Sequence, residues 1–230
     1  DVIMLGAGPS LNKENSALLN GKNVIFLNSS YKLIHKILPS KSFWLVQSNI
    51  RHIEMLDVDR ALFTASFRST HNLISFQPKT YKADFFIKPR VRIRMGRLFP
   101  LPLVADQLNF VPFEVDKGLA LGGYSVLFSA LQLAVYMGAS RIALLGIDMD
   151  YDGTVRGSYF DGAEIKNDRA YWAADYDRIR PAFFSYKKIF ASLGVQLFNC
   201  SCQTKEDVLD KKTLENFCRG QKIVNDLNNR

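Results

Sequence analysis

The sequence has few cysteines and no long apolar run, and both shortages exclude classes of protein. Its three cysteines, Cys200, Cys202 and Cys218, are odd in number and lack metal-site spacing, which argues for a reducing compartment and against a disulfide framework. No apolar run reaches the roughly 18 residues that a membrane-spanning helix needs. We therefore expect a cytoplasmic protein in which Cys200 and Cys202 are small packing residues. The sequence leaves open whether flanking segments, including a membrane anchor, belong to the protein.

Several well-known motifs are also missing. The sequence contains neither the GxGxxG of dinucleotide-binding proteins nor the Gly-Lys-Ser/Thr of a P-loop, and it lacks the nucleophile elbow of Ser/His/Asp hydrolases. The three histidines, His35, His52 and His71, are isolated and lie early in the chain. No nucleic-acid-binding motif is present, so nucleic acid is not an expected partner.

The 230 residues, 47% of them hydrophobic, suit a single α/β domain. Strand and helix patterns alternate, which predicts a Rossmann-like, mostly parallel sheet flanked by helices. Residues 77–120 hold five prolines and break the pattern, so we expect an inserted lid or acceptor-facing region there. The expected strands are 2–5, 23–27, 42–46, 141–147 and 195–199, and the expected helices are 11–19, 30–37, 124–137, 179–192 and 211–227.

A glycine-rich turn, Gly6-Ala7-Gly8-Pro9-Ser10, separates the first expected strand from the first expected helix. In such a turn, backbone N–H groups can approach a phosphate, and Ser10 can cap the helix or bond a phosphate oxygen. A side chain at Gly8 should then block the phosphate and leave the fold intact. A plain tight turn without a ligand is the alternative.

The segment 122–160 carries the richest pattern. It begins with a Gly122-Gly123 turn and a helical stretch, and its apolar strand runs into Asp148, Asp150 and Tyr151. Ligands bind beyond the carboxyl ends of strands in open α/β sheets, so these residues are placed where a ligand would lie. The Asp148–Asp150 spacing could also hold Mg²⁺ against a diphosphate. Alternatively, Asp148 only caps the turn that follows the strand.

Much of the formal charge of +8 lies in residues 88–97. There, Arg90, Arg92 and Arg94 alternate with apolar residues, which suits a strand with one basic face. Such a face could attract an acidic acceptor or a phospholipid surface. A merely solvated strand face is the alternative.

Taken in order, several motifs resemble one known group of proteins. They are GAGPSL after the first strand, Asn28-Ser29-Ser30 after the second, GGYSV, IALLGIDMDY, GSYF and GVQLFNCS. The set resembles the bacterial family of motility-associated factors and 6-hydroxymethylpterin diphosphokinase-like enzymes, and it is similar to the family 42 sialyltransferases. The resemblance covers roughly residues 1–50 and 118–218.

The resemblance implies roles for particular residues. Gly6, Gly8 and Ser10 would line the phosphate of CMP, and Asn28 would contact the nucleotide. Tyr151 and Tyr159 would hydrogen-bond the departing phosphate, although they lie eight residues apart rather than six. The expected nucleotide-binding set is Gly6, Ala7, Gly8, Ser10, Asn28, Ser29, Gly122, Gly123, Gly146 and Asp148.

Two departures from the family pattern bear on the chemistry. Ala7 stands where the family has an asparagine, and the family's catalytic histidine has no counterpart. An ungapped match puts Asp177 near the place of that histidine, with Asp175 close by, so either could be the base. Alternatively, both aspartates are helix N-terminal charges ahead of the expected helix 179–192.

We therefore expect an inverting, metal-independent glycosyltransferase. It would move a sialic-acid-like or Kdo-like sugar from a CMP-activated donor to a cell-surface glycan or glycolipid of lipopolysaccharide or capsule, with Arg90, Arg92 and Arg94 facing the acceptor. An ATP- and Mg²⁺-dependent diphosphokinase-like enzyme and a non-catalytic nucleotide- or glycan-binding domain of a larger protein are the alternatives. Two further partners are left as alternatives: the inner membrane, through peripheral contact, and a second copy of the chain in a homo-oligomer.

Overall fold

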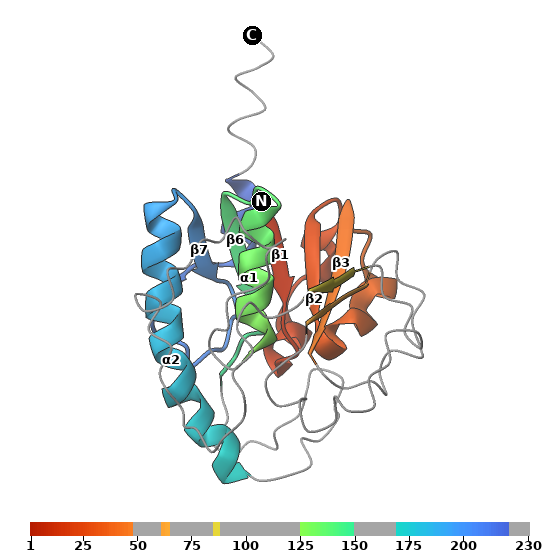
Figure 1. The fold of residues 1–230 in the computed structure, drawn as a ribbon. Coiled ribbons are helices and arrows are strands. Elements are labelled where there is room, and N and C mark those ends of the chain that lie inside the picture. Colours follow the sequence, from red (N-terminus) through yellow and green to blue (C-terminus); the bar gives the residue numbers. More distant parts are fainter. Residues whose placement is uncertain (48–60, 65–84, 88–124, 150–168, 221–230) are drawn as a thin grey trace.

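A parallel β-sheet between two layers of helices organises the chain (Figure 1). The computed structural model describes residues 1–47, 61–64, 85–87, 125–149 and 169–220. The expected α/β class with a parallel sheet is confirmed, since every described strand pair is parallel. The strands are β1 (Val2–Leu5), β2 (Asn23–Leu27), β3 (Lys41–Gln47), β4 (Ala61–Thr64), β5 (Phe85–Ile87), β6 (Arg141–Leu145), β7 (Gln196–Asn199) and β8 (Asp210–Lys211).

The strand order is β5-β4-β3-β2-β1-β6-β7-β8. β2 to β5 therefore extend in one direction from β1, and β6 to β8 extend in the other. Leu5 at the end of β1 is in register with Leu145 at the end of β6. This junction, where the order reverses, brings together segments from opposite halves of the chain.

Helices cover both faces of the sheet. The α-helices are α1 (Val126–Tyr136), α2 (Arg169–Ser192) and α3 (Leu214–Arg219), and the 3₁₀ helices are η1 (Pro9–Lys13), η2 (Ser16–Leu19) and η3 (Asn28–Lys36). α1 and α2 pack on one face, and the 3₁₀ helices and α3 pack on the other. No helix in the described ranges is long and apolar enough to cross a membrane.

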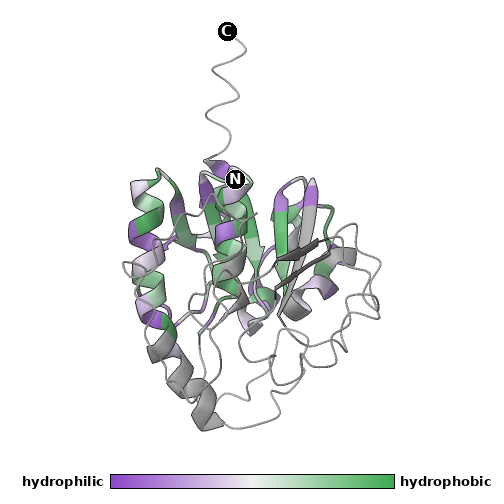
Figure 2. Ribbon diagram, viewed as in Figure 1, coloured by the Kyte–Doolittle hydropathy of each residue, from purple (hydrophilic) through white to green (hydrophobic). Residues whose placement is uncertain are grey.

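The alternation of side chains along each strand feeds two separate cores. On β1, Val2 and Met4 join the core under α1 and α2, whereas Ile3 and Leu5 join the core under η1, η2, η3 and α3. Successive side chains of a strand point to opposite faces, so a strand covered on both sides must be apolar throughout. Figure 2 shows this as continuous hydrophobic colour along the central strands.

The helices differ from the sequence prediction in three places. The expected helix 11–19 is two 3₁₀ helices, because Asn15 accepts a hydrogen bond from Ala17 N and starts a new turn. The expected helix 30–37 is the 3₁₀ helix η3. The expected helix 179–192 begins ten residues earlier, at Arg169, and continues through the exposed Pro181.

Some boundaries and strands were also mispredicted. β6 ends at Leu145 rather than at 147, because Gly146 turns the chain with a positive φ of 68°. β4, β5 and β8 were not predicted, and β5 lies within the expected lid 77–120. The rest of that lid lies outside the described residues. Of the expected helix 211–227, α3 covers only 214–219, because Lys211 belongs to β8 and the helix ends before Gly220; residues 221–230 lie outside the described part.

Candidate functional site

The candidate site lies at the carboxyl ends of β1 and β6, where the strand order reverses. In open α/β sheets, the crevice at such a junction is the usual place for a ligand. The turn Gly6–Ser10 follows β1, and Gly146 to Met149 follow β6. The structure therefore brings together Gly6, Ala7, Gly8, Ser10, Gly146 and Asp148 from the expected nucleotide-binding set.

Hydrogen bonds join the two segments closely. Gly6 N donates to Leu145 O at 2.7 Å, and Gly8 N donates to Gly146 O at 2.9 Å. Ser10 donates its N–H to Asp148 Oδ2 at 2.8 Å and its hydroxyl to Asp148 Oδ1. Three backbone N–H groups that the sequence offered to a phosphate thus have acceptors within the protein.

Asp148 is a buried carboxylate, with only 7% of its surface exposed. A charge taken out of water is costly unless it is hydrogen-bonded, and bonds to an ionised acceptor are stronger than neutral ones. The two bonds from Ser10 supply that compensation. Asp148 therefore ties the end of β6 to the turn after β1, a structural role that differs from the expected cap of the turn after its own strand.

The glycines are required by this close contact. A Cβ on Gly6 would lie 2.4 Å from Gly146 O, and one on Gly8 would lie 2.5 Å from Asp148 Oδ2. Such distances force neighbouring atoms to move. The space beside Gly8 is thus filled by the protein, so a side chain there would disturb the β1–β6 contact, contrary to the expectation of an intact fold.

Met149 adopts a left-handed conformation with φ of 52° and is buried. This region costs a residue with a Cβ about 1–2 kcal/mol and persists only where surrounding contacts enforce it. The enforcing contacts reach the two residues before it. Thr204 Oγ1 donates to Ile147 O at 2.8 Å, and Lys205 N donates to Asp148 O at 2.8 Å.

The loop after β7 forms a buried polar network that the sequence did not predict. Glu206 is fully buried, and its carboxylate accepts bonds from Asn199 Nδ2 at 3.0 Å and from the backbone N–H groups of Val208 and Leu209. Ser201 Oγ accepts a bond from Ile147 N at 3.0 Å. The only available signal was the NCS motif, residues 199–201, at the end of β7.

Two adjacent serines after β2 differ in the hydrogen bonding of their hydroxyl groups. Ser30 is fully buried, and its hydroxyl lies 2.6 Å from Leu5 O and 2.9 Å from Leu27 N. The neighbouring Ser29 has a buried Oγ without a hydrogen-bond partner in the described part of the chain. Buried hydroxyls are normally paired, so this one needs an explanation. Asn28 begins η3, but its side chain lies outside the described part.

The expected catalytic aspartates both lie within α2. Asp175 and Asp177 are the seventh and ninth residues of a helix that begins at Arg169. The alternative that they stand ahead of a helix as N-terminal charges is therefore wrong. Their side chains lie outside the described part. The other expected site residues lie outside the described ranges altogether: Tyr151, Tyr159, Gly122, Gly123, Arg90, Arg92 and Arg94.

A cluster between α2 and the β7–β8 loop was also missed. Arg180 makes two bonds of 2.8 Å to the Asp207 carboxylate, and the Tyr176 hydroxyl donates to Asp207 Oδ1 at 2.6 Å. Partial burial and the bond to Asp207 raise the pKa of Tyr176 to about 12. The Arg180 guanidinium and the Tyr176 hydroxyl hold the pKa of Asp207 well below its usual range. The cluster fastens α2 to the loop behind the site.

The cysteines do not provide a reactive thiol. Cys200 is buried, as expected, and burial raises its pKa to about 12. Cys202 is exposed and not a packing residue. Its N–H donates to Glu14 Oε1 at 3.0 Å, and desolvation and Glu14 raise the pKa of its thiol. Nucleophilic cysteines need a lowered pKa, so neither residue suits that role.

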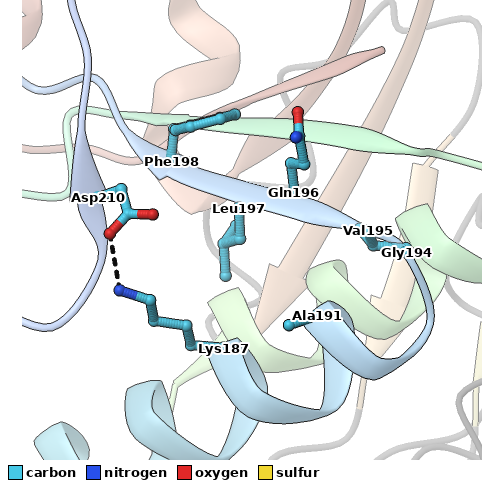
Figure 3. A pocket seen from close by; sticks show the side chains of 8 residues that line it. All are labelled: Lys187, Ala191, Gly194, Val195, Gln196, Leu197, Phe198 and Asp210. Atoms are coloured by element: carbon cyan, nitrogen blue, oxygen red, sulfur yellow. Dashed lines mark hydrogen bonds and ion pairs between the residues drawn. The ribbon is translucent and has the colours of Figure 1, made fainter.

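A hollow of about 370 Å³ lies elsewhere, between the second half of α2 and β7 (Figure 3). Lys187 and Asp210 face one another across it and form an ion pair of 2.7 Å. No residue of the expected nucleotide-binding set lines it. We therefore place the candidate site at the β1–β6 junction on topology and not on the size of this hollow.

Neither a search for metal ligands nor a comparison with known proteins narrows the choice of function. Within the described ranges, no group of three or more His, Cys, Asp or Glu side chains could hold a metal ion. Comparison with protein-family models, characterised proteins and solved structures found no match. The functional argument therefore rests on the residues and geometry of this chain.

Proposed function

We propose that this chain is a glycosyltransferase with a Rossmann-like nucleotide-binding fold and, beyond β5, a lid or acceptor-facing insertion within residues 77–120. It would move a sialic-acid-like or Kdo-like sugar from a CMP-activated donor to a glycan destined for the cell surface. The transfer itself would take place in the cytoplasm. The observation that carries the proposal is the strand order, which reverses between β1 and β6 directly beside the glycine turn and Asp148. The motif resemblance supplies the donor class.

The geometry suggests how such a nucleotide would be bound. The N–H groups of Gly6, Gly8 and Ser10 already donate hydrogen bonds within the protein. In this proposal the turn therefore contributes to binding by shaping the crevice beside the end of β6. The Ser29 hydroxyl has no hydrogen-bond partner in the described part of the chain and stands after β2, the strand next to β1. A nucleotide oxygen in the crevice would supply that partner.

The proposed reaction has a simple balance. The acceptor oxygen forms a bond to the anomeric carbon, the bond from that carbon to the CMP phosphate oxygen breaks, and the acceptor proton passes to an aspartate. In this proposal the base is Asp177 or, failing it, Asp175, and Tyr151 and Tyr159 donate hydrogen bonds to the departing phosphate. Positions two apart on a helix are separated by about 200° around its axis, so only one of the two aspartates is expected to serve.

Nucleotide binding provides the direct test. We expect CMP to raise the melting temperature of the whole chain without metal, and CDP, UDP, GDP and ATP to do so less. A shift that requires ATP with Mg²⁺ would replace the proposal with the diphosphokinase-like alternative. No shift with any nucleotide would favour a non-catalytic glycan-binding domain.

Adjacent serines give a matched pair of variants for this test. Ser29→Ala removes a hydroxyl that has no partner in the described part, so the unliganded protein should keep its melting temperature while the CMP-induced shift falls. Ser30→Ala removes a buried hydroxyl that joins the ends of β1 and β2, so it should lower the melting temperature itself. An unchanged CMP shift in Ser29→Ala would remove that residue from the nucleotide site.

A further inference from the structure

Large apolar side chains are exposed at the end of the molecule opposite the candidate site. Leu38, Tyr136, Met137 and Leu193 account for four of the five exposed large hydrophobic residues in the described part, and Leu38 is 78% exposed. Leu38 precedes β3, Tyr136 and Met137 end α1 ahead of β6, and Leu193 follows α2 ahead of β7. Because parallel strands begin at the same side of a sheet, all four lie at what we call the amino edge.

Contacts between the connecting segments confirm this placement. Gly21 N donates to Leu38 O at 2.8 Å, which joins the segments that lead into β2 and β3. Gln196 N donates to Ser140 O at 2.9 Å, which joins the segments that lead into β6 and β7. Figure 1 shows the carboxyl end of α2 and the N-terminus at the same end of the molecule.

Basic residues surround these apolar side chains. Lys36 and Lys41 are exposed on either side of Leu38, and Lys188 is exposed on the last turns of α2. The carboxylate of Asp1 at the start of β1 is paired with Arg141 at 2.8 Å, so it does not offset these lysines. The amino edge therefore combines exposed apolar side chains with a positive charge.

We propose that the amino edge binds the surface of an anionic membrane. Lysines attract anionic headgroups, and separate apolar and aromatic side chains among them insert at the boundary between headgroups and acyl chains. The core of a protein–protein interface is depleted of charged residues, whereas Lys36 and Lys41 lie exposed on either side of Leu38, which fits an anionic bilayer surface better. Strands of four to seven residues, at about 3.3 Å per residue, put the candidate site about 13–23 Å from the amino edge, facing away from the membrane.

Sedimentation of the whole chain with lipid vesicles tests the proposal. We expect binding to vesicles of equal parts phosphatidylcholine and phosphatidylglycerol, weaker binding at high salt, and little binding to phosphatidylcholine alone. Lys36→Glu with Lys41→Glu should weaken binding on the order of 25-fold or more, since each lysine near an anionic surface contributes roughly five-fold. Leu38→Ser with Leu193→Ser should weaken it by at least about ten-fold, because apolar area is no longer buried.

Matched controls lie away from the amino edge. Phe184→Ser removes the remaining exposed large hydrophobic residue of the described part, on the flank of α2, and Lys211→Glu reverses an exposed charge on β8. Both variants should bind vesicles as the unchanged chain does. No binding by the unchanged chain, equal binding to neutral vesicles, or an equal loss in the controls would overturn the proposal. The CMP-induced melting shift is a separate readout, so failure of one proposal leaves the other standing.

Discussion

Ser10 donates both its backbone N–H and its hydroxyl to the carboxylate of Asp148, which lies 138 residues further along the chain. Ser10 comes from the turn after β1, and Asp148 comes from the segment after β6. The pair therefore closes the junction at which the strand order reverses. Both residues are buried, so the bond bears on stability as well as on the shape of the proposed site.

We expect Ser10→Ala to lower the free energy of unfolding by about 1–3 kcal/mol, because a buried carboxylate loses one of its donors. Denaturant unfolding of the whole chain measures this change. Ser192→Ala is the matched control, because that serine is exposed and bonds only within its own helix. It should change stability by less than about 0.5 kcal/mol. An equal loss in the two variants would mean that the Ser10–Asp148 bond contributes no more to the free energy of unfolding than the bond of an exposed serine does.

The glycines beside this pair allow a comparison of two physical effects. Gly6→Ala should cost about 3 kcal/mol or more, because its Cβ would lie 2.4 Å from a backbone oxygen and part of the β1–β6 contact must move. Gly21→Ala should cost only about 1–2 kcal/mol, because its positive φ is strained but nothing lies within 4 Å of the added atom. Melting temperatures of the two variants should therefore fall in that order. A larger loss at Gly21 would contradict the steric argument.

The sequence was informative where a pattern had one physical cause. β1, β2 and β6 are buried on both faces, so their apolar runs could be recognised without knowledge of their partners. The start of α2 was missed because residues 169–178 mix three alanines with charged and aromatic residues and show no clear apolar repeat. Within that stretch, Tyr176 has its hydrogen-bond partner, Asp207, 31 residues away. The Ser10–Asp148 pair shows the same limit: sequence alone predicted both residues at a site, but it could not show that each satisfies the other.

The cluster of Tyr176, Arg180 and Asp207 should make stability depend on pH at the acid end. The pKa of Asp207 is lowered in the folded protein, chiefly by the bond from Arg180. Its contribution to stability is therefore complete above the unfolded pKa near 3.8 and is lost as the pH falls below that value. Asp207→Asn should lower stability at neutral pH and lose less than the unchanged chain on acidification. Both side chains of the ion pair are about half exposed, so the difference should be small and should shrink in high salt.

Parallel acid titrations of the two proteins, followed by circular dichroism, measure that difference. Asp210→Asn serves as the control, because Asp210 also pairs with a basic residue of α2 but receives no tyrosine bond within the described ranges. Its acid titration should follow that of the unchanged chain more closely. Identical titrations of the unchanged chain and Asp207→Asn would show that the cluster does not fasten α2 to the loop.

The last prediction concerns catalysis and rests on the proposed transfer from a CMP-activated sugar. Asp177→Asn should lower kcat by about 10²–10⁴-fold, the usual contribution of a general base, with the KM for the donor nearly unchanged. It should also abolish the limb of the pH–rate profile that reports ionisation of the base, which a purely structural effect on α2 would leave in place. Tyr151→Phe removes a hydrogen bond that strengthens as the phosphate departs, so it should lower kcat more than it raises KM.

Steady-state kinetics on a donor that has first been shown to be a substrate provide the measurement. Asp210→Asn is again the control, because it removes an acidic partner of α2 without touching the proposed base, and it should keep kcat within about two-fold because surface substitutions rarely matter more. If Asp177→Asn keeps full turnover and Asp175→Asn loses it, the base is Asp175, one half-turn of α2 away. If both variants keep full turnover, the acceptor proton goes elsewhere, and the assignment of the base to α2 is wrong.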